Sequence, residues 1–183
     1  MSGSEGRAPD EVRLRERIEG LLGRATAAQE ARDPVNPAMI RHWCDAIEDD
    51  NPVYTDEEAA ATSLHGGIVA PPTMLQAWSM WGLAGRRLGQ RPVAAGPMGL
   101  LDEAGYTSVV ATNCEQEYAR YLHLGDELTM TSKLESISGE KQTALGDGYF
   151  VTHVTTYRDR EGEVVARMRF RMLKFKPPQR ASA

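Results

Sequence analysis

The chain has 183 residues, 41% of them hydrophobic and 26% charged, which is the composition of an ordinary globular domain able to bury its own core. Its net charge of −5 gives no overall attraction to nucleic acid or to an anionic membrane, and no basic patch with interleaved aromatics is present. No apolar run reaches membrane-spanning length, so we expect neither a nucleic-acid partner nor a membrane span.

Two features of the sequence, its N-terminus and its cysteines, indicate the cellular compartment. The N-terminus has no apolar segment typical of a signal peptide. Cys44 and Cys114 lie far apart in segments that look structured, which favours two small buried thiols in a reducing environment. We therefore expect a cytoplasmic protein.

The N-terminal part is predicted to be helical after a short tail. Residues 1–9 are rich in Gly, Ser and Pro and are expected to be disordered. Asp10 can cap a helix that continues to about Arg32. After the break at "DPVNP", Asn36 and Pro37 are typical of a helix start, and this helix is expected to end near Asp49.

The middle of the chain contains a strongly apolar helix. Asp56 to Thr62 is predicted to be a short helix, and Pro72 can open another whose face carries Met74, Leu75, Trp78, Trp81 and Leu83. Residues 84–106 show little periodicity and are predicted to be a long loop with a helical turn at residues 99–103.

From Tyr106 the hydrophobic period changes from 3.6 to 2, which indicates strands. "DELTMTSKLESIS", "YFVTHVTTYRD" and "EVVARMRFRML" each alternate, with "GEKQ" and "DREGE" as turns between them. The last three strands are expected to form an antiparallel meander. The order of elements predicts an α+β fold in which a long antiparallel sheet wraps around a central apolar helix, as one domain over residues 10–176. Residues 177–183 are expected to be a tail, or the point at which a further domain was removed.

The stretch "DDNPVY" carries the first chemical signal. It reads Asp49-Asp50-Asn51-Pro52-Val53-Tyr54, and Ala60 stands six residues after Tyr54. This resembles the MaoC-like hotdog family of (R)-specific enoyl-CoA hydratases and dehydratases, whose motif reads Asp-x-Asn-Pro-aliphatic-His, five residues, then a small residue. Every position agrees except the histidine.

A closer resemblance is carried by "PVNPAMIRHWCDAIEDDNPVY", "GIVAPPTMLQAW", "ATNCEQEYARYL" and "KQTALGDGYF". These are similar to the MaoC-like portion of the larger subunit of bacterial heteromeric steroid side-chain enoyl-CoA hydratases. The resemblance implies a smaller partner subunit that carries the Asp/His pair, an expected heterotetramer, and an aldolase docked through an additional C-terminal domain. It implies a CoA thioester as substrate and no cofactor.

Two parts of the hydratase machinery are altered in this chain. Hydration delivers water to C3 and a proton to C2, work suited to a carboxylate and an imidazole that share one water. Tyr54 stands where the resemblance expects the imidazole, and a phenol with a reference pKa of about 10 is a poor base at pH 7. The family's oxyanion donor aligns with Ala70 and Pro71, and proline has no N–H. No catalytic residue is therefore expected here, and Asp49, Asn51 and Tyr54 form a degenerate site.

Structural readings of the same residues stay open beside the functional ones. Asp49 can simply cap a turn, and Asn51-Pro52 is a turn signal on any fold. Tyr54 can be a half-buried aromatic residue, and His65 can be a solvated loop residue. The remaining histidines, His42, His123 and His153, show no spacing typical of a metal site, and none is expected.

The substrate contacts expected from the resemblance are Tyr54, His65, Met74, Trp78 and Trp81, with Met80 as a further channel wall. Trp78 and Trp81 can equally be core residues. Arg86, Arg87 and Arg91 can meet CoA phosphates or can be solvated loop residues. Three functions remain: a non-catalytic subunit that shapes the acyl tunnel, a self-sufficient hydratase that uses Asp49, and a non-enzymatic acyl-CoA-binding scaffold.

Overall fold

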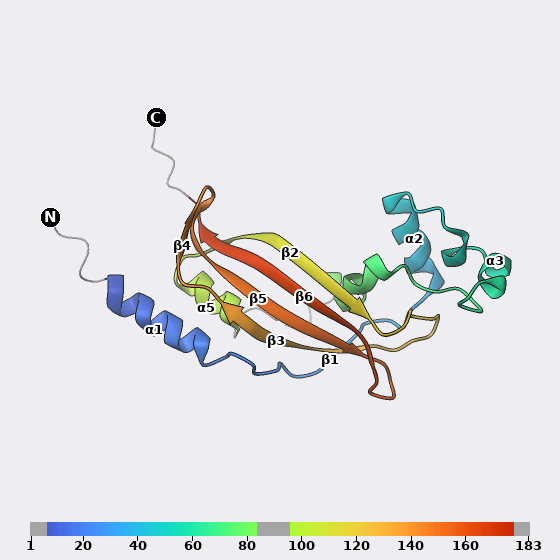
Figure 1. The fold of residues 1–183 in the computed structure, drawn as a ribbon, viewed down its shortest axis with the longest axis horizontal. Helices are drawn as coiled ribbons and strands as arrows, with labels where there is room; N and C mark the ends of the chain where they lie inside the picture. Colours follow the sequence, from blue (N-terminus) through green and yellow to red (C-terminus); the bar gives the residue numbers. More distant parts are fainter. Residues whose placement is uncertain (1–6, 84–95, 178–183) are drawn as a thin grey trace.

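The computed structural model describes residues 7–83 and 96–177, and its centre is one long, twisted antiparallel sheet (Figure 1). Neighbouring strands follow the order β1-β3-β5-β6-β2, and β4 pairs with β5. The strands are β1 (Gln29–Glu30), β2 (Ser108–Tyr118), β3 (Thr129–Ile137), β4 (Lys141–Thr143), β5 (Gly146–Arg158) and β6 (Val164–Lys176). The meander β3-β5-β6 is confirmed, and β2 forms one edge of the sheet.

Alternation along the strands produces the two faces of the sheet. On β6, Ala166 and Met168 are buried, while Arg167, Arg169 and Arg171 are exposed. This is the period expected of a sheet with one face on a core. Cys114 lies on the edge strand β2 and is exposed, so the prediction of two buried thiols is wrong for Cys114 and right for Cys44.

The first helix is shorter than predicted. Helix α1 (Arg7–Glu19) begins inside the expected tail and ends thirteen residues before Arg32. Gly20 and Gly23 follow it, and Gly23 takes a φ of 71°, where glycine is favoured. The chain then runs along β3, since Gly23 N–H donates to the Leu134 carbonyl and Thr26 N–H to the Ser132 carbonyl. Pairing with a sheet edge thus overrides the helix propensity of "ATAAQEAR".

An arm of short helices extends beyond one end of the sheet (Figure 1). It contains α2 (Pro37–Ile47), the 3₁₀ turn η1 (Pro52–Tyr54) and α3 (Glu57–Thr62). Asn36 caps α2 as predicted, because its side chain accepts from Met39 N–H at 3.0 Å. Asp56 caps α3 in the same way.

Two hydrophobic clusters lie under the sheet. The 3₁₀ helix η2 (Pro72–Ser79) places Met74, Leu75 and Trp78 in the first cluster, with residues of α2, β3, β5 and β6. Helices α1 and α5 (Pro97–Glu103) cover the second cluster, and α5 confirms the helical turn predicted there.

The predicted apolar helix is also shorter than expected. It ends at Ser79, and Leu83 is 68% exposed. Three arginines of the predicted loop lie outside the described residues: Arg86, Arg87 and Arg91. The same is true of residues 1–6 of the predicted N-terminal tail (residues 1–9) and of residues 178–183 of the predicted C-terminal tail (residues 177–183). No helix of the described part is long and apolar enough to span a membrane.

Candidate active site

The loop that carries the degenerate motif is built from side chains that cap its own backbone. Glu48 ends α2 in a left-handed conformation, with φ of 57°. The Asp49 carboxylate then accepts from Asn51 N–H at 3.2 Å, and the Asn51 amide oxygen accepts from Val53 N–H at 3.3 Å. Both side chains therefore have the structural role that their residue types allow in a turn.

Tyr54 is half-buried and packs against the first hydrophobic cluster. Burial, followed by the charges of Tyr121 and Asp49, raises the pKa of Tyr54 above its usual value. The raised pKa keeps the phenol neutral near pH 7.

No histidine replaces the missing base. The His65 ring lies against the Tyr121 ring, with centroids 4.4 Å apart, and the His65 backbone N–H donates to the Ser63 hydroxyl. Within the described residues, no hydrogen bond or ion pair joins Asp49 to any histidine. The structure brings His65 to Tyr121 and leaves Asp49 without an imidazole partner.

Residues 70–72, at the start of η2, offer no backbone donor for an oxyanion. Pro71 and Pro72 have no N–H, and the Ala70 N–H already donates to the Leu122 carbonyl at 2.8 Å. Three successive backbone positions are therefore unable to stabilise a developing enolate. This extends the sequence argument, which concerned Ala70 and Pro71.

A cavity of about 150 Å³ lies directly beside this helix start. One wall is formed by residues 70–72 and Leu75. The other is formed by Tyr118, the last residue of β2, and by Arg120, Tyr121 and Leu122, which follow it. Sequence reasoning missed the second wall, although "EYARYL" is part of one of the segments that carry the resemblance. A strand pattern alone does not show that its last residues turn toward a helix start.

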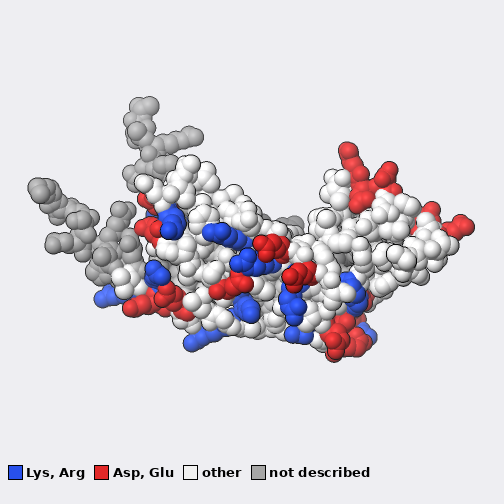
Figure 2. All heavy atoms as spheres, in the orientation of Figure 1, with Lys and Arg blue, Asp and Glu red and all other residues white. Residues whose placement is uncertain are grey.

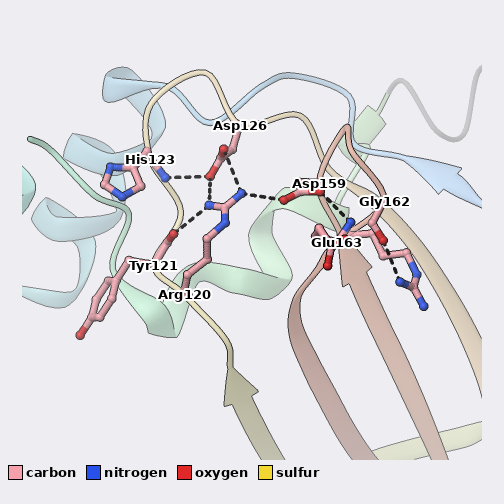
Figure 3. A network of polar contacts seen from close by, with 8 residues as sticks. Arg120, Tyr121, His123, Asp126, Asp159, Gly162 and Glu163 are labelled. Carbon is pink, nitrogen blue, oxygen red and sulfur yellow. Dashed lines mark hydrogen bonds and ion pairs between the residues drawn. The ribbon is translucent and has the colours of Figure 1, made fainter.

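An ion-pair network holds this second wall in place (Figure 3). The Arg120 guanidinium contacts Asp126 at 2.6 Å and Asp159 at 3.1 Å. Asp126 also accepts from His123 N–H, and Asp159 accepts from Glu163 N–H, each at 2.8 Å. The network thus joins the segment after β2 to the turn between β5 and β6.

The predicted channel residues do not all come together. Met74 and Trp78 are buried in the first cluster beside Tyr54. Trp81 is held elsewhere, because its indole N–H donates to the Glu30 carbonyl of β1 at 3.1 Å. Met80 is 62% exposed. Trp81 is therefore an anchor to the sheet edge in this structure.

The arm is strongly acidic. Residues 45–58 contain seven Asp or Glu residues, and residues 42–83 contain no Lys or Arg. Arg41 of α2 is a basic residue of the arm. On the face shown in Figure 2, acidic side chains gather toward the outer end of the arm. No group of three His, Cys, Asp or Glu side chains in the described parts of the chain could hold a metal ion.

Comparison with known sequences gives a consistent picture. A family model described as the FAS1-like dehydratase domain region matches residues 21–168. The "Probable enoyl-CoA hydratase alpha subunit" of Thermomonospora curvata is 48% identical over 165 residues, covering 88% of this chain and 51% of that protein. The "3-oxo-4,17-pregnadiene-20-carboxyl-CoA hydratase alpha subunit" of Mycobacterium tuberculosis is 50% identical over 148 residues, covering 80% and 47%. The chain spans about half the length of these curated relatives.

Solved structures support the same assignment. A chain of the ChsH1-ChsH2 complex from Mycobacterium tuberculosis superposes with a TM-score of 0.81 at 44% identity, covering 91% of this chain and 98% of that one. The MaoC-like dehydratase from Rhodospirillum rubrum superposes with a TM-score of 0.60 at 26% identity, covering 88% and 97%. This chain belongs to the FAS1-like dehydratase family and has the MaoC-like hotdog fold.

Proposed function

We propose that this chain is the non-catalytic MaoC-like subunit of a heteromeric enoyl-CoA hydratase. The reaction adds water across the conjugated C=C of a CoA thioester: the water oxygen bonds to C3 and a proton is added at C2. The substrate class in this proposal is a steroid side-chain thioester, and the name of the Mycobacterium tuberculosis relative supports it. The reaction requires no cofactor, and the chain acts in the cytoplasm.

The observation that carries the proposal is the helix start at residues 70–72, where no N–H is available to an oxyanion. Tyr54 supports it independently, because its raised pKa keeps the phenol protonated. Losing a single oxyanion donor typically costs about 10²–10³ in rate, and losing a general base about 10²–10⁴. The two losses together leave no useful hydration on this chain.

The partner is a smaller MaoC-like subunit that carries the Asp/His pair. Strand β2 is a sheet edge eleven residues long, and most of its residues are exposed. Open edges are normally paired or covered. A second hotdog sheet that pairs with β2 forms a continuous sheet and encloses an acyl tunnel between the two subunits. An aldolase is a further expected partner, through sequence outside this chain.

The test is hydration of a steroid enoyl-CoA by this chain, by the partner, and by the mixture, followed as loss of the conjugated enoyl absorbance. The neighbouring reading frame is the first place to find the partner, as a short hotdog sequence with an intact Asp-x-Asn-Pro-x-His. Activity is expected only in the mixture, and Asp49→Asn in this chain should leave it intact. Full activity of this chain alone would overturn the proposal.

The self-sufficient hydratase that uses Asp49 is disfavoured by the structure, since the Asp49 carboxylate serves the turn. The scaffold alternative is favoured by the same missing donors. It predicts saturable binding of the acyl-CoA with no turnover in any mixture.

A further inference from the structure

We propose that a pocket on the outer face of the sheet binds the carboxylate group of a small organic acid. The outer face is the one that carries Arg167, Arg169 and Arg171, and the pocket there has a volume of about 340 Å³. Its lining shares no residue with the degenerate loop at residues 49–54 or with the cavity beside η2. The inference is therefore independent of the proposed function.

A row of four polar side chains crosses the pocket, one from each of the strands β2, β6, β5 and β3, which lie side by side in Figure 1. Arg171 of β6 is paired with Asn113 of β2 on one side and with Thr152 of β5 on the other. Thr152 is in turn paired with Ser136 of β3. Paired residues point to the same face, and neighbouring strands are about 4.8 Å apart. A ligand group bound to Arg171 is therefore within reach of polar side chains on both sides.

A β-bulge on each side shapes the sheet around this row. The register of β2 against β6 shifts just before Asn113, and that of β3 against β5 shifts just before Ser136. In the first bulge, the Thr112 hydroxyl donates to the Arg171 carbonyl at 3.1 Å. Bulges bend a strand and redirect its side chains, and they are frequent beside active sites. Two bulges beside one row show that the local shape of the sheet is built around it.

Arg171 is the cation that the pocket offers to a ligand. Its guanidinium lies over the Phe150 ring, 4.4 Å from the ring centroid. Within residues 7–83 and 96–177, the Arg171 side chain forms no ion pair and no hydrogen bond. The contact with the ring orients the guanidinium and leaves its N–H groups unused. A planar guanidinium with unused N–H groups matches the two oxygens of a carboxylate.

The neighbours of Arg171 in the row also have unused polar groups. Thr152 is only 3% exposed and lines the pocket, and its hydroxyl forms no hydrogen bond to any described residue. The side chains of Asn113 and Ser136 are likewise without a partner in the described part of the chain. A buried hydroxyl without a partner is unfavourable, so an oxygen that accepts from Thr152 stabilises the site. These groups supplement the guanidinium with uncharged donors.

The remaining charges of the pocket favour a ligand with a single negative charge. The Arg169 guanidinium is held by Glu135 at 2.6 Å and by Glu115 at 3.5 Å, so its charge is already balanced. Arg171 is then the one unbalanced cation of the lining residues, and Glu115 also lines the pocket. A second negative charge on the ligand would face the Glu115 carboxylate without a cation to offset it. A monocarboxylate is therefore preferred to phosphate.

The volume of the pocket leaves room for the body of the acid. A volume of about 340 Å³ lies at the lower end of the range of small-molecule sites, roughly 300–1,000 Å³. A benzene-sized molecule occupies a cavity of roughly 150 Å³ in other proteins. Phe150 and the aliphatic stem of Arg171 provide apolar surface beside the polar row. An acid with one aromatic ring, such as benzoate, fits this space and serves as the probe.

Titration of this chain with benzoate, followed by backbone amide chemical shifts, tests the site. Saturable shifts are expected at Asn113, Ser136 and Thr152. Benzamide has the same shape without the charge and should bind about tenfold more weakly, because hydrogen bonds to a charged group are the stronger ones. Inorganic phosphate should also bind more weakly than benzoate. Shifts confined to other residues, or binding of benzamide or phosphate as tight as that of benzoate, would overturn the proposal.

A pair of arginine variants separates the pocket from the general charge of the outer face. Arg171→Met removes the guanidinium and should weaken benzoate binding about tenfold or more. Arg167→Met is the matched control, because Arg167 is an exposed residue of the same strand and face but does not line the pocket. The control should bind benzoate like wild type. Unchanged binding in Arg171→Met, or the same loss in both variants, would show that Arg171 does not hold the carboxylate. The comparison of benzoate with benzamide on wild type decides the question where Arg171→Met does not fold.

Discussion

Replacing Arg120 with methionine tests whether the network in Figure 3 holds the wall of the cavity. The substitution keeps most of the aliphatic stem and removes the guanidinium, so Asp126 and Asp159 lose their shared cation. The side chains of these two carboxylates are only 19% and 10% exposed. Their charges would then face each other with little solvent between them.

The expected loss in the free energy of unfolding is about 2 kcal/mol. Removing one partner of a fully buried ion pair typically costs about 3–5 kcal/mol, and exposed pairs contribute about 0–1 kcal/mol. The Arg120 side chain is 37% exposed, which places this network between the two cases. A loss of this size lowers Tm by roughly 4–8 °C in a domain of 150 residues or more.

Urea unfolding and thermal scans of wild type and Arg120→Met measure this loss. Arg160→Met is the matched control, because Arg160 and Glu127 form an ion pair in which both side chains are more than half exposed. The control should unfold like wild type. Equal stability of Arg120→Met and wild type would refute the reasoning, since the two carboxylates would then need no cation.

The pH dependence of the free energy of unfolding is an independent test of the same network. Burial disfavours the charged form of Asp159, but the hydrogen bonds from Arg120 and Glu163 N–H outweigh it and lower the Asp159 pKa. A lowered folded-state pKa stabilises the protein above the unfolded value of about 3.9, and this contribution is lost as pH falls through the folded value. The difference between wild type and Arg120→Met should therefore be largest near neutral pH and shrink in acid. A difference that grows in acid would contradict the assignment.

Three further outcomes follow from single positions. Gly148→Ala should unfold or strongly destabilise the sheet, because its Cβ would lie 2.4 Å from the Lys174 carbonyl, whereas Gly162→Ala meets no atom within 4 Å and should lose only about 1 kcal/mol from its φ of 85°; equal Tm values for both variants would contradict this. Cys114 should react quickly with a thiol reagent while buried Cys44 reacts only on unfolding, and adding the partner should slow Cys114 if it pairs with β2. Spectrophotometric titration should show phenols that resist ionisation, since burial is the main cause that raises the pKa of Tyr118 and of Tyr157 to about 12; a late step that is smaller in Tyr157→Phe than in wild type is the check.

Local signals in the sequence were sufficient for elements whose determinants are local. The cap at Asn36, the helix at residues 57–62 and the strand meander all follow from capping chemistry and periodicity within a few residues. The prediction that the first helix continues to Arg32 was wrong because the structure of this segment is determined by contacts distant in sequence. The segment 23–30 makes backbone hydrogen bonds to β3, roughly 100 residues away along the chain, and no local propensity reports that pairing.

The candidate site divides in the same way. The missing imidazole at Tyr54 and the missing N–H at Pro71 can be read from single residues. The hydrogen bond from the Ala70 N–H to the Leu122 carbonyl cannot be predicted from single residues, because it requires the segment after β2 to lie beside the start of η2. The cavity and its second wall arise from that same long-range contact.

The persistence of the hydratase motif without its histidine has a physical explanation. Asp49 and Asn51 cap successive backbone N–H groups, so they are needed for the turn whether or not any reaction occurs. The histidine position has no such role, and Tyr54 there adds a half-buried ring to the hydrophobic cluster. Two adjacent prolines likewise give η2 a rigid start and remove the donors that a reacting thioester needs. A motif whose residues stabilise a turn is therefore weak evidence for activity. The backbone N–H donors available at the start of η2 are the better criterion for activity.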